Sequence, residues 1–369
     1  MAGCTGATLR VHLLMAGGRW LPPRRPQLVC TTETREYNPR LPRVTITLVR
    51  VTTRLAWIAT VLVVASACDK AHASGRPGAA SRSVSSGPQL DLRSHPDLLF
   101  EVFGDPNDPR MIPIAAIEHN QLQQISLDTT GWRQLDAAYL RSSKSYDIFE
   151  DGHAAGTVQI RRGMWQGDDP LYALPGCQLL TPMAAVRLES QDKSPTFTVE
   201  YLASTATLGH ERDVTPMPSA EVERIARAIG SEVAKTVGIS QAALDSLDFH
   251  AIAFASGNGR WPTIVAGFID PAAENPVSTQ ETTTHLILIA DRDSAATEYH
   301  PTYTHRVQGP LASSSFRRFF DHLDVNGDGV DEIFLEGWQF GSDTYLSVLS
   351  WKDGKWEESY RTRTKWCLD

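Results

Sequence analysis

The nine residues from Asp324 to Glu332 place side-chain oxygens at alternating positions of a short, glycine-rich segment. Residues 324, 326 and 328 are Asp, Asn and Asp, Gly329 follows, and the segment DVNGDGVDE ends in an acid. Ca²⁺ takes about six to eight oxygen ligands, and a short loop supplies them when Asp or Asn recurs at every second residue. Gly329 permits a sharp bend. The predicted calcium ligands are Asp324, Asn326, Asp328, the carbonyl of Val330, and Glu332.

An ordinary hairpin turn is the alternative interpretation of this segment, because Asn-Gly and Asp-Gly form turns without any metal. An EF-hand is a poor match. Its loop needs a bidentate Glu at the twelfth position and a helix on each side, whereas the twelfth residue here is Leu335. The residues that follow the loop, 333–335 and 345–351, have strand character. The segment is therefore expected to join two strands.

The loop and its flanking strands resemble the FG-GAP or VCBS-type repeats of integrin-like β-propellers and of many exported bacterial proteins. In those repeats the loop ends at its ninth position with an acid that leads into a strand, and Glu332 occupies that position. The resemblance covers residues 316–360, the length of one repeat. It implies that Asp331 points outward. It also implies side-chain ligands at Asp324, Asn326, Asp328 and Glu332.

The residues from Arg50 to Cys68 have the order of a secretory signal. Arg50 and Arg54 precede an apolar run, residues 55–64, and Ala-Ser-Ala-Cys follows at once. This order of charged, apolar and small residues is that of a signal peptide, and the run is too short to span a bilayer permanently. Because a cysteine follows the small residues directly, the segment resembles a bacterial lipobox, which implies that Cys68 is lipidated. A signal peptide with a fortuitous cysteine is the alternative.

These assignments divide the chain into regions. Residues 1–43 are rich in Arg and lack periodicity, and we interpret them as a non-native extension translated from upstream of the true start. The later regions are a signal peptide (44–67), a lipid-attached flexible tether (68–94), a β-rich region (95–210), and a helix followed by hairpins that carry the calcium loop (215–369). The expected location is the bacterial cell envelope, with the protein anchored in the membrane by its lipid and facing the periplasm or the exterior.

The charge of the chain argues against nucleic acid as a partner. The chain carries 35 Lys and Arg against 43 Asp and Glu, and without residues 1–67 it carries 26 against 41. Such an acidic protein repels phosphate backbones. The sequence also lacks a basic stripe with interleaved aromatic residues.

Two cysteines remain for the folded part of the chain. Cys4 and Cys30 lie in the N-terminal extension, and Cys68 is the lipid attachment site. In an oxidising compartment, Cys177 and Cys367 are expected to form one disulfide. Two unpaired thiols are the alternative.

The folded part is expected to be α+β. Runs of strand length separated by turn pairs, such as Asp151-Gly152, indicate antiparallel hairpins in both halves. Between the halves, apolar residues at helical spacing predict a helix over 219–237 capped by Ser219, and Ser240 opens a second short helix. A closed propeller needs at least about four blades. We therefore expect mostly antiparallel sheets, one or two packed helices and one propeller-like blade near the C-terminus.

Common catalytic motifs are absent from the sequence: it has no GxSxG elbow, no HExxH, no Walker loop and no GxGxxG after a strand. Asp321 and His322, beside the calcium loop, have the chemistry of an acid and a base. Because neither a nucleophile nor a substrate accompanies them, we interpret them as surface residues. We assign no catalytic residue and no cofactor other than Ca²⁺.

Two classes of function stay open. The first is a noncatalytic envelope lipoprotein with a structural calcium site that binds a protein or a glycan through aromatic residues near the loop. Those residues are Trp338, Phe340, Tyr345 and Trp356, for which packing in the core is the alternative. The second is an exported hydrolase whose catalytic residues are scattered in sequence. Carboxylates that converge in a deep cleft, or a Ser-His pair there, would favour the hydrolase.

Overall fold

The computed structural model describes residues 90–163, 183–190, 198–210, 212, 216–271, 282–292, 298–339 and 344–362. The chain divides into two units, and all the described residues belong to the one that contains Ser86–Asp369. Antiparallel strands dominate and helices are few. This confirms the predicted antiparallel sheets and packed helices at the level of fold class.

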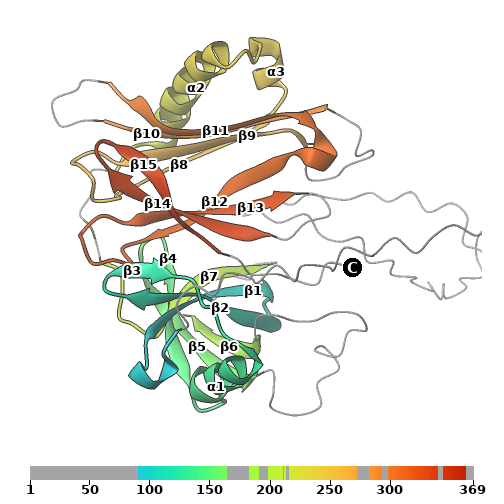
Figure 1. Ribbon diagram of the computed structural model, residues 1–369. Helices are drawn as coiled ribbons and strands as arrows, with labels where there is room; N and C mark the ends of the chain where they lie inside the picture. The colour runs from blue at the N-terminus through green and yellow to red at the C-terminus, as the bar shows by residue number, and fades with distance from the viewer. Residues whose placement is uncertain are drawn as a thin grey trace, which may run out of the picture. The chain divides into compact units, whose positions relative to one another are not determined.

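Six strands of the first half close into a barrel (Figure 1). Their order is β1-β7-β4-β5-β6-β2, and pairing of β2 with β1 closes the ring. The strands are β1 (Asp97–Asp105), β2 (Asp108–Glu118), β4 (Ser145–Glu150), β5 (His153–Gly163), β6 (Ala184–Ser190) and β7 (Val199–Ser204). The short strand β3 (Gln121–Gln123) extends the sheet beside β2. The sequence predicted these hairpins but not their closure.

Every second side chain of a barrel strand belongs to the same core. Leu98, Phe100 and Val102 of β1 pack in one core, whereas Leu99 belongs to a different one, because successive residues of a strand point to opposite faces. A helix, α1 (Thr129–Tyr139), adds Leu135 to the first core. The short 3₁₀ helix η1 (Leu92–Ser94) precedes the barrel.

The second half contains two four-stranded antiparallel sheets in which neighbours in sequence pair with each other. The first consists of β8 (Asp248–Phe254), β9 (Thr263–Ile269), β10 (Thr282–Asp291) and β11 (His300–Pro310). The second consists of β12 (Ser315–Leu323), β13 (Glu332–Gln339), β14 (Tyr345–Lys352) and β15 (Lys355–Arg361). The 3₁₀ helix η4 (Leu311–Ser313) connects the two sheets. Helices α2 (Ser219–Thr236) and α3 (Gln241–Asp245) precede the first sheet.

The central strands of these two sheets are buried on both faces, whereas β11 and β15 are partly exposed. In β9, Ile264 and Phe268 share a core with α2, while Val265 shares a core with Ile333 and Leu335 of β13. Burial on both faces requires a continuous apolar run instead of alternation, and β9 is buried along its whole length. The β12–β15 sheet therefore packs against the β8–β11 sheet.

The other face of the β12–β15 sheet packs against the barrel. Phe334 and Val348 share a core with Leu99 of β1. The hydroxyl of Tyr360 donates to the carbonyl oxygen of Ile114 at 2.6 Å. The sheet that carries the predicted calcium loop thus lies between the barrel and the other sheet.

Helices α2 and α3 have different residues at their N-terminal caps. The prediction that Ser219 caps α2 is wrong: Pro218 holds the cap position and makes no side-chain hydrogen bond there. Proline suits this position because its fixed φ matches the entry to a helix. For α3 the prediction is confirmed, since the Ser240 hydroxyl accepts from the Ala243 N–H at 3.2 Å.

An ionic cluster joins the barrel to β12. Arg318 of β12 donates to Glu200 of β7 at 2.7 Å and also to Glu336 of β13. Glu101 of β1 belongs to the same cluster. Burial, followed by the charges of Glu336 and Glu200, raises the pKa of the Glu101 carboxyl to about 8 against the opposing effect of Arg318.

Replacement of Glu101 by Gln is expected to flatten the dependence of stability on pH. Because the folded-state pKa of Glu101 lies near 8, above the ordinary value, its contribution to stability is complete at acid pH. It is lost as pH rises toward 8, by at most about 1.4 kcal/mol for each pH unit. Chemical unfolding at pH 5.5 and pH 8 measures the change. The variant should lose less stability than the wild type over this interval, whereas Glu357→Gln, at an exposed site on β15, should follow the wild type.

Candidate functional site

The loop between β12 and β13 is organised by its own acidic and amide side chains. Asp324 accepts from the N–H groups of Gly327 and Gly329, at 2.7 and 3.0 Å. Both glycines have positive φ, 72° and 88°, a conformation that other residues adopt only with strain. Asp328 accepts from the N–H of Val330 at 2.8 Å. The carboxylate of Asp324 is therefore inside the turn, and its burial is nearly complete.

The side chains of the predicted ligands Asn326, Asp328 and Glu332 meet on one side of the loop. The amide nitrogen of Asn326 donates to Asp328 Oδ2 at 3.1 Å and to Glu332 Oε1 at 2.6 Å. Burial, and then the charges of Asp328 and Asp324, raise the pKa of Glu332 to about 8 despite a hydrogen bond from the Val325 N–H. Acids crowded in this way favour a bound cation, and carboxylate oxygens are the donors that a hard cation takes. Asn326 turns its amide nitrogen toward these carboxylates, while its Oδ1 accepts from the Asp328 N–H at 2.8 Å.

Asp331 lies in the interior and not at the surface. Its side chain is 1% exposed, so the outward orientation implied by the family resemblance is wrong. One carboxylate oxygen lies 2.7 Å from Nδ1 of His322, and the other accepts from Arg212 Nη2 at 2.6 Å. The backbone N–H of Asp331 donates to the Ser256 carbonyl at 2.7 Å. A carboxylate with these partners is stabilised by them instead of by water.

Asp321 and His322 are also buried, which corrects their interpretation as surface residues. They are 2% and 4% exposed. The His322 ring stacks on Phe254 of β8 with ring centroids 3.9 Å apart, so the imidazole is held between the β8–β11 sheet and Asp331. A bulge in β12 accompanies the pair, since the register with β13 shifts between Phe319 and Asp321.

The turn between β4 and β5 brings a third group to this pair. Asp151, Asp321 and His322 each offer one ligand atom, and these atoms lie within 4.8 Å of one another. The Asp151 N–H donates to Asp321 Oδ1 at 3.0 Å. These three residues can hold a metal ion, as an acidic and histidine group of this kind does in other proteins. By the same distance criterion, the loop carboxylates of Asp324, Asp328 and Glu332 do not form such a group.

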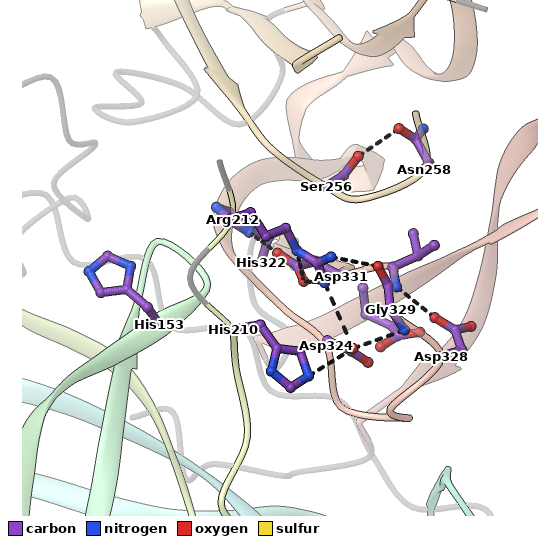
Figure 2. Close-up of polar contacts among 12 residues, drawn as sticks. His153, His210, Arg212, Ser256, Asn258, His322, Asp324, Asp328, Gly329 and Asp331 are labelled. Carbon is purple, nitrogen blue, oxygen red and sulfur yellow. Dashed lines mark hydrogen bonds and ion pairs between the residues drawn. The ribbon is translucent and has the colours of Figure 1, made fainter. Parts of the chain in front are cut away.

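Two further segments complete the site. Arg212 donates to the Gly329 carbonyl at 2.6 Å as well as to Asp331, and Nε2 of His210 lies 3.6 Å from Asp324 (Figure 2). The β8–β9 turn approaches from the other side, where a Cβ on Gly257 would lie 2.3 Å from the Gly329 carbonyl oxygen. Gly257 has a φ of 86°, so glycine is required there for both space and conformation.

A cavity of about 890 Å³ opens beside this group. Asp151 and His322 line it, together with residues of several elements that include His153, His210, Arg212 and His250. The volume lies in the range of small-molecule sites. The lining carries more ionisable groups than a typical apolar ligand pocket, so a polar occupant suits the cavity better than an apolar one.

The aromatic residues near the loop do not form one exposed surface. Trp356 is buried and its Nε1 donates to Asp291 at 2.8 Å. Trp338 packs partly buried against Phe316, with ring centroids 5.5 Å apart. The alternative of core packing holds for these two. Tyr345 is partly buried, and Phe340 lies outside the described residues.

The remaining predicted sites lie outside the part of the chain that the structure describes. These are the lipidation site Cys68 and the two cysteines of the predicted disulfide, Cys177 and Cys367. Among the helices that are described, none combines the length and apolar composition of a membrane span.

Arg212 and the convergence of Asp151 with Asp321 were not predicted from the sequence. The sequence did indicate the turn that carries Asp151, because Asp-Gly is typical of a hairpin turn. The structure has a turn there, with φ values of 52° and 78° at Asp151 and Gly152. The partner lies 170 residues further along the chain. No periodicity or spacing relates two positions so far apart.

A comparison of Gly152→Ala with Gly354→Ala tests how closely the β4–β5 turn packs on His322. Both glycines follow an Asp in a tight turn, with φ of 78° and 84°. A Cβ at Gly152 would lie 2.6 Å from His322 Cε1, whereas no atom of the described residues lies within 4 Å of one at Gly354. We expect Gly354→Ala to lower the free energy of unfolding by about 1–2 kcal/mol, from backbone strain alone. Gly152→Ala should cost roughly 2–4 kcal/mol because the clash adds to the strain. Equal losses in denaturant unfolding would contradict this packing.

Comparison of the chain with models of protein families, with curated proteins and with solved structures gave no match in any of the three.

Proposed function

We propose that this protein is a lipoprotein of the bacterial cell envelope in which a calcium loop stabilises a noncatalytic binding module. The observation that carries the proposal is the position of the 324–332 loop. It starts from a sheet packed between the barrel and the β8–β11 sheet, and it contacts the residues that line the cavity through Asp331. Calcium bound in the loop would hold one wall of the cavity in place.

The fit of the loop to Ca²⁺ rests on its donors. Asn326, Asp328 and Glu332 converge on one side, and the turn is closed by Asp324. The meander β12–β15, with the loop between its first two strands, supports the resemblance of this segment to one blade of an FG-GAP or VCBS-type repeat. In that arrangement Asp324, Asn326, Asp328, Val330 and Glu332 hold the ion.

The binding role rests on the cavity. Its histidine and charged lining suits a polar partner, and a glycan or a polar protein segment has the required hydrogen-bonding groups. The anchored location rests on the order of charged, apolar and small residues before Cys68. A lipid anchor and a flexible tether would place the module near the membrane surface.

An exported hydrolase is the second candidate, favoured by one specific observation. Asp151, Asp321 and His322 converge beside the cavity, which Asp151 and His322 line. Convergent acidic and basic side chains beside a cavity distinguish an active site from a simple binding surface. Among the described residues that line the cavity, Ser219 is the single hydroxyl-bearing side chain, and it lies at the start of α2. A hydrolase here would therefore use either the Ser219 hydroxyl or an activated water as its nucleophile.

Calcium is expected to stabilise the protein against heat. At a hundredfold excess over the dissociation constant, binding to the folded state adds about 2.7 kcal/mol to the free energy of unfolding. Asp328→Ala should remove this gain, because Asp328 is an exposed loop residue that offers a carboxylate to the ion. The melting temperature with millimolar Ca²⁺, compared with that in a chelator, measures the effect. Asp353→Ala, at another exposed turn, should keep the full response, and an unresponsive wild type would exclude the calcium site.

Cys68 is expected to carry lipid and to be the first residue of the mature protein. Two or three acyl chains give stable anchoring where a single chain does not. Cys68→Ser should therefore leave a precursor that is uncut or cut elsewhere and that does not stay in the membrane fraction. Mass spectrometry of the N-terminal peptide identifies the modification. A different mature N-terminus with unmodified Cys68 would leave a secreted protein without an anchor.

A further inference from the structure

We propose that Asp151, Asp321 and His322 bind a divalent transition metal ion, in a site separate from the calcium loop. The three ligand atoms lie within 4.8 Å of one another, and the residues come from the β4–β5 turn and the end of β12. The site goes beyond the proposed calcium-stabilised binding module, because it adds a second ion of different chemistry at the cavity.

The imidazole of His322 provides the first argument. Its Nδ1 is engaged by Asp331 at 2.7 Å. Its Nε2 is buried and has no hydrogen-bond partner among the described residues. A buried polar atom left unsatisfied costs about 1–3 kcal/mol. A metal ion on Nε2 would satisfy it, and a carboxylate on the opposite nitrogen is the usual companion of a metal-binding histidine because it fixes the tautomer and the ring.

The two carboxylates provide the second argument. Asp321 Oδ1 accepts from the backbone N–H groups of Asp151 and His322, at 3.0 and 2.8 Å. These hydrogen bonds fix the orientation of the Asp321 side chain before any ion binds. The Asp151 side chain is exposed and lines the cavity, so an ion can enter from that side. Hydrogen bonds within the protein thus hold Asp321 and His322 in position before an ion binds.

The mixture of one imidazole and two carboxylates indicates the class of ion. Ca²⁺ and Mg²⁺ take oxygen ligands, whereas imidazole nitrogen suits Zn²⁺, Fe²⁺, Ni²⁺ or Cu²⁺. The calcium loop, with an all-oxygen donor set, has the opposite preference. Three protein ligands also leave a coordination position free, and Asp151 and His322 face the cavity where that position would lie. A polar group of a bound ligand, or a water molecule, could occupy it.

The test uses the full mature protein saturated with Ca²⁺ and titrated with Co²⁺, whose visible absorption reports coordination, or with Zn²⁺ by calorimetry. We expect about one equivalent to bind. Asp151→Asn and Asp321→Asn should each weaken binding by at least about tenfold. Asp151 has a φ of 52°, which Asn tolerates well, and its side chain is exposed, so this variant should fold normally.

The matched control is Asp353→Asn. Asp353 begins another Asp-Gly turn, has a φ of 49°, is also exposed, and is not part of the group. It should bind Co²⁺ like the wild type. The proposal is overturned if the wild type binds no Co²⁺ or Zn²⁺ in the presence of Ca²⁺, or if Asp151→Asn and Asp353→Asn bind equally well. Asp328→Ala separates the two sites: if it loses the thermal response to Ca²⁺ but binds Co²⁺, the transition metal site stands on its own.

Discussion

The arrangement of residues between the 324–332 loop and the cavity depends on the buried carboxylate of Asp331. One oxygen holds His322, the other holds Arg212, and the backbone N–H beside them donates to Ser256. A carboxylate in the interior is unstable without partners, and removal of one partner from a buried pair costs more than the pair itself contributes. Each of these partners therefore has to be in place when the chain folds. Through this one residue the 324–332 loop, β12, the segment at residue 212 and the β8–β9 turn meet at a single point.

The packing of the sheets explains why those segments meet. The β12–β15 sheet has an apolar residue on both faces at successive positions, Ile333 toward the β8–β11 sheet and Phe334 toward the barrel. Burial of both faces fixes the sheet between two layers. Its 324–332 loop then meets turns of those layers. Glycines with positive φ allow the close approach, because Gly257 packs against the backbone of Gly329 and Gly152 packs against the side chain of His322. The position of the site is therefore a consequence of core packing.

Local patterns predicted the local elements of this fold. Phased oxygens indicated the loop at 324–332, helical spacing indicated α2, and Asp151-Gly152 indicated a hairpin. The closure of the barrel could not be predicted, because it depends on the pairing of β1 with β7 and of β2 with β6, which are distant in the sequence. The same limit applies to the group at the cavity. Asp321 and His322 were interpreted as surface residues because neither a nucleophile nor a substrate accompanied them in the sequence, and only the docking of the other layers buries them.

Asp331 also connects the two inferred ions. It lies in sequence between Asp328 and Glu332, so an ion that orders the loop orders the segment that carries Asp331. Asp331 in turn fixes the His322 ring through Nδ1, and a fixed ring binds an ion at Nε2 with less loss of conformational freedom. Repulsion between the two cations acts against this favourable coupling, but the negative charges of the carboxylates at both sites reduce the repulsion. Because coupling between two binding sites is reciprocal, the affinity for Ca²⁺ should change by the same factor when the cavity site is filled. Substitution of Asp331 by Asn would keep every proposed ligand residue of both ions, while weakening the contact with His322 that couples the two sites.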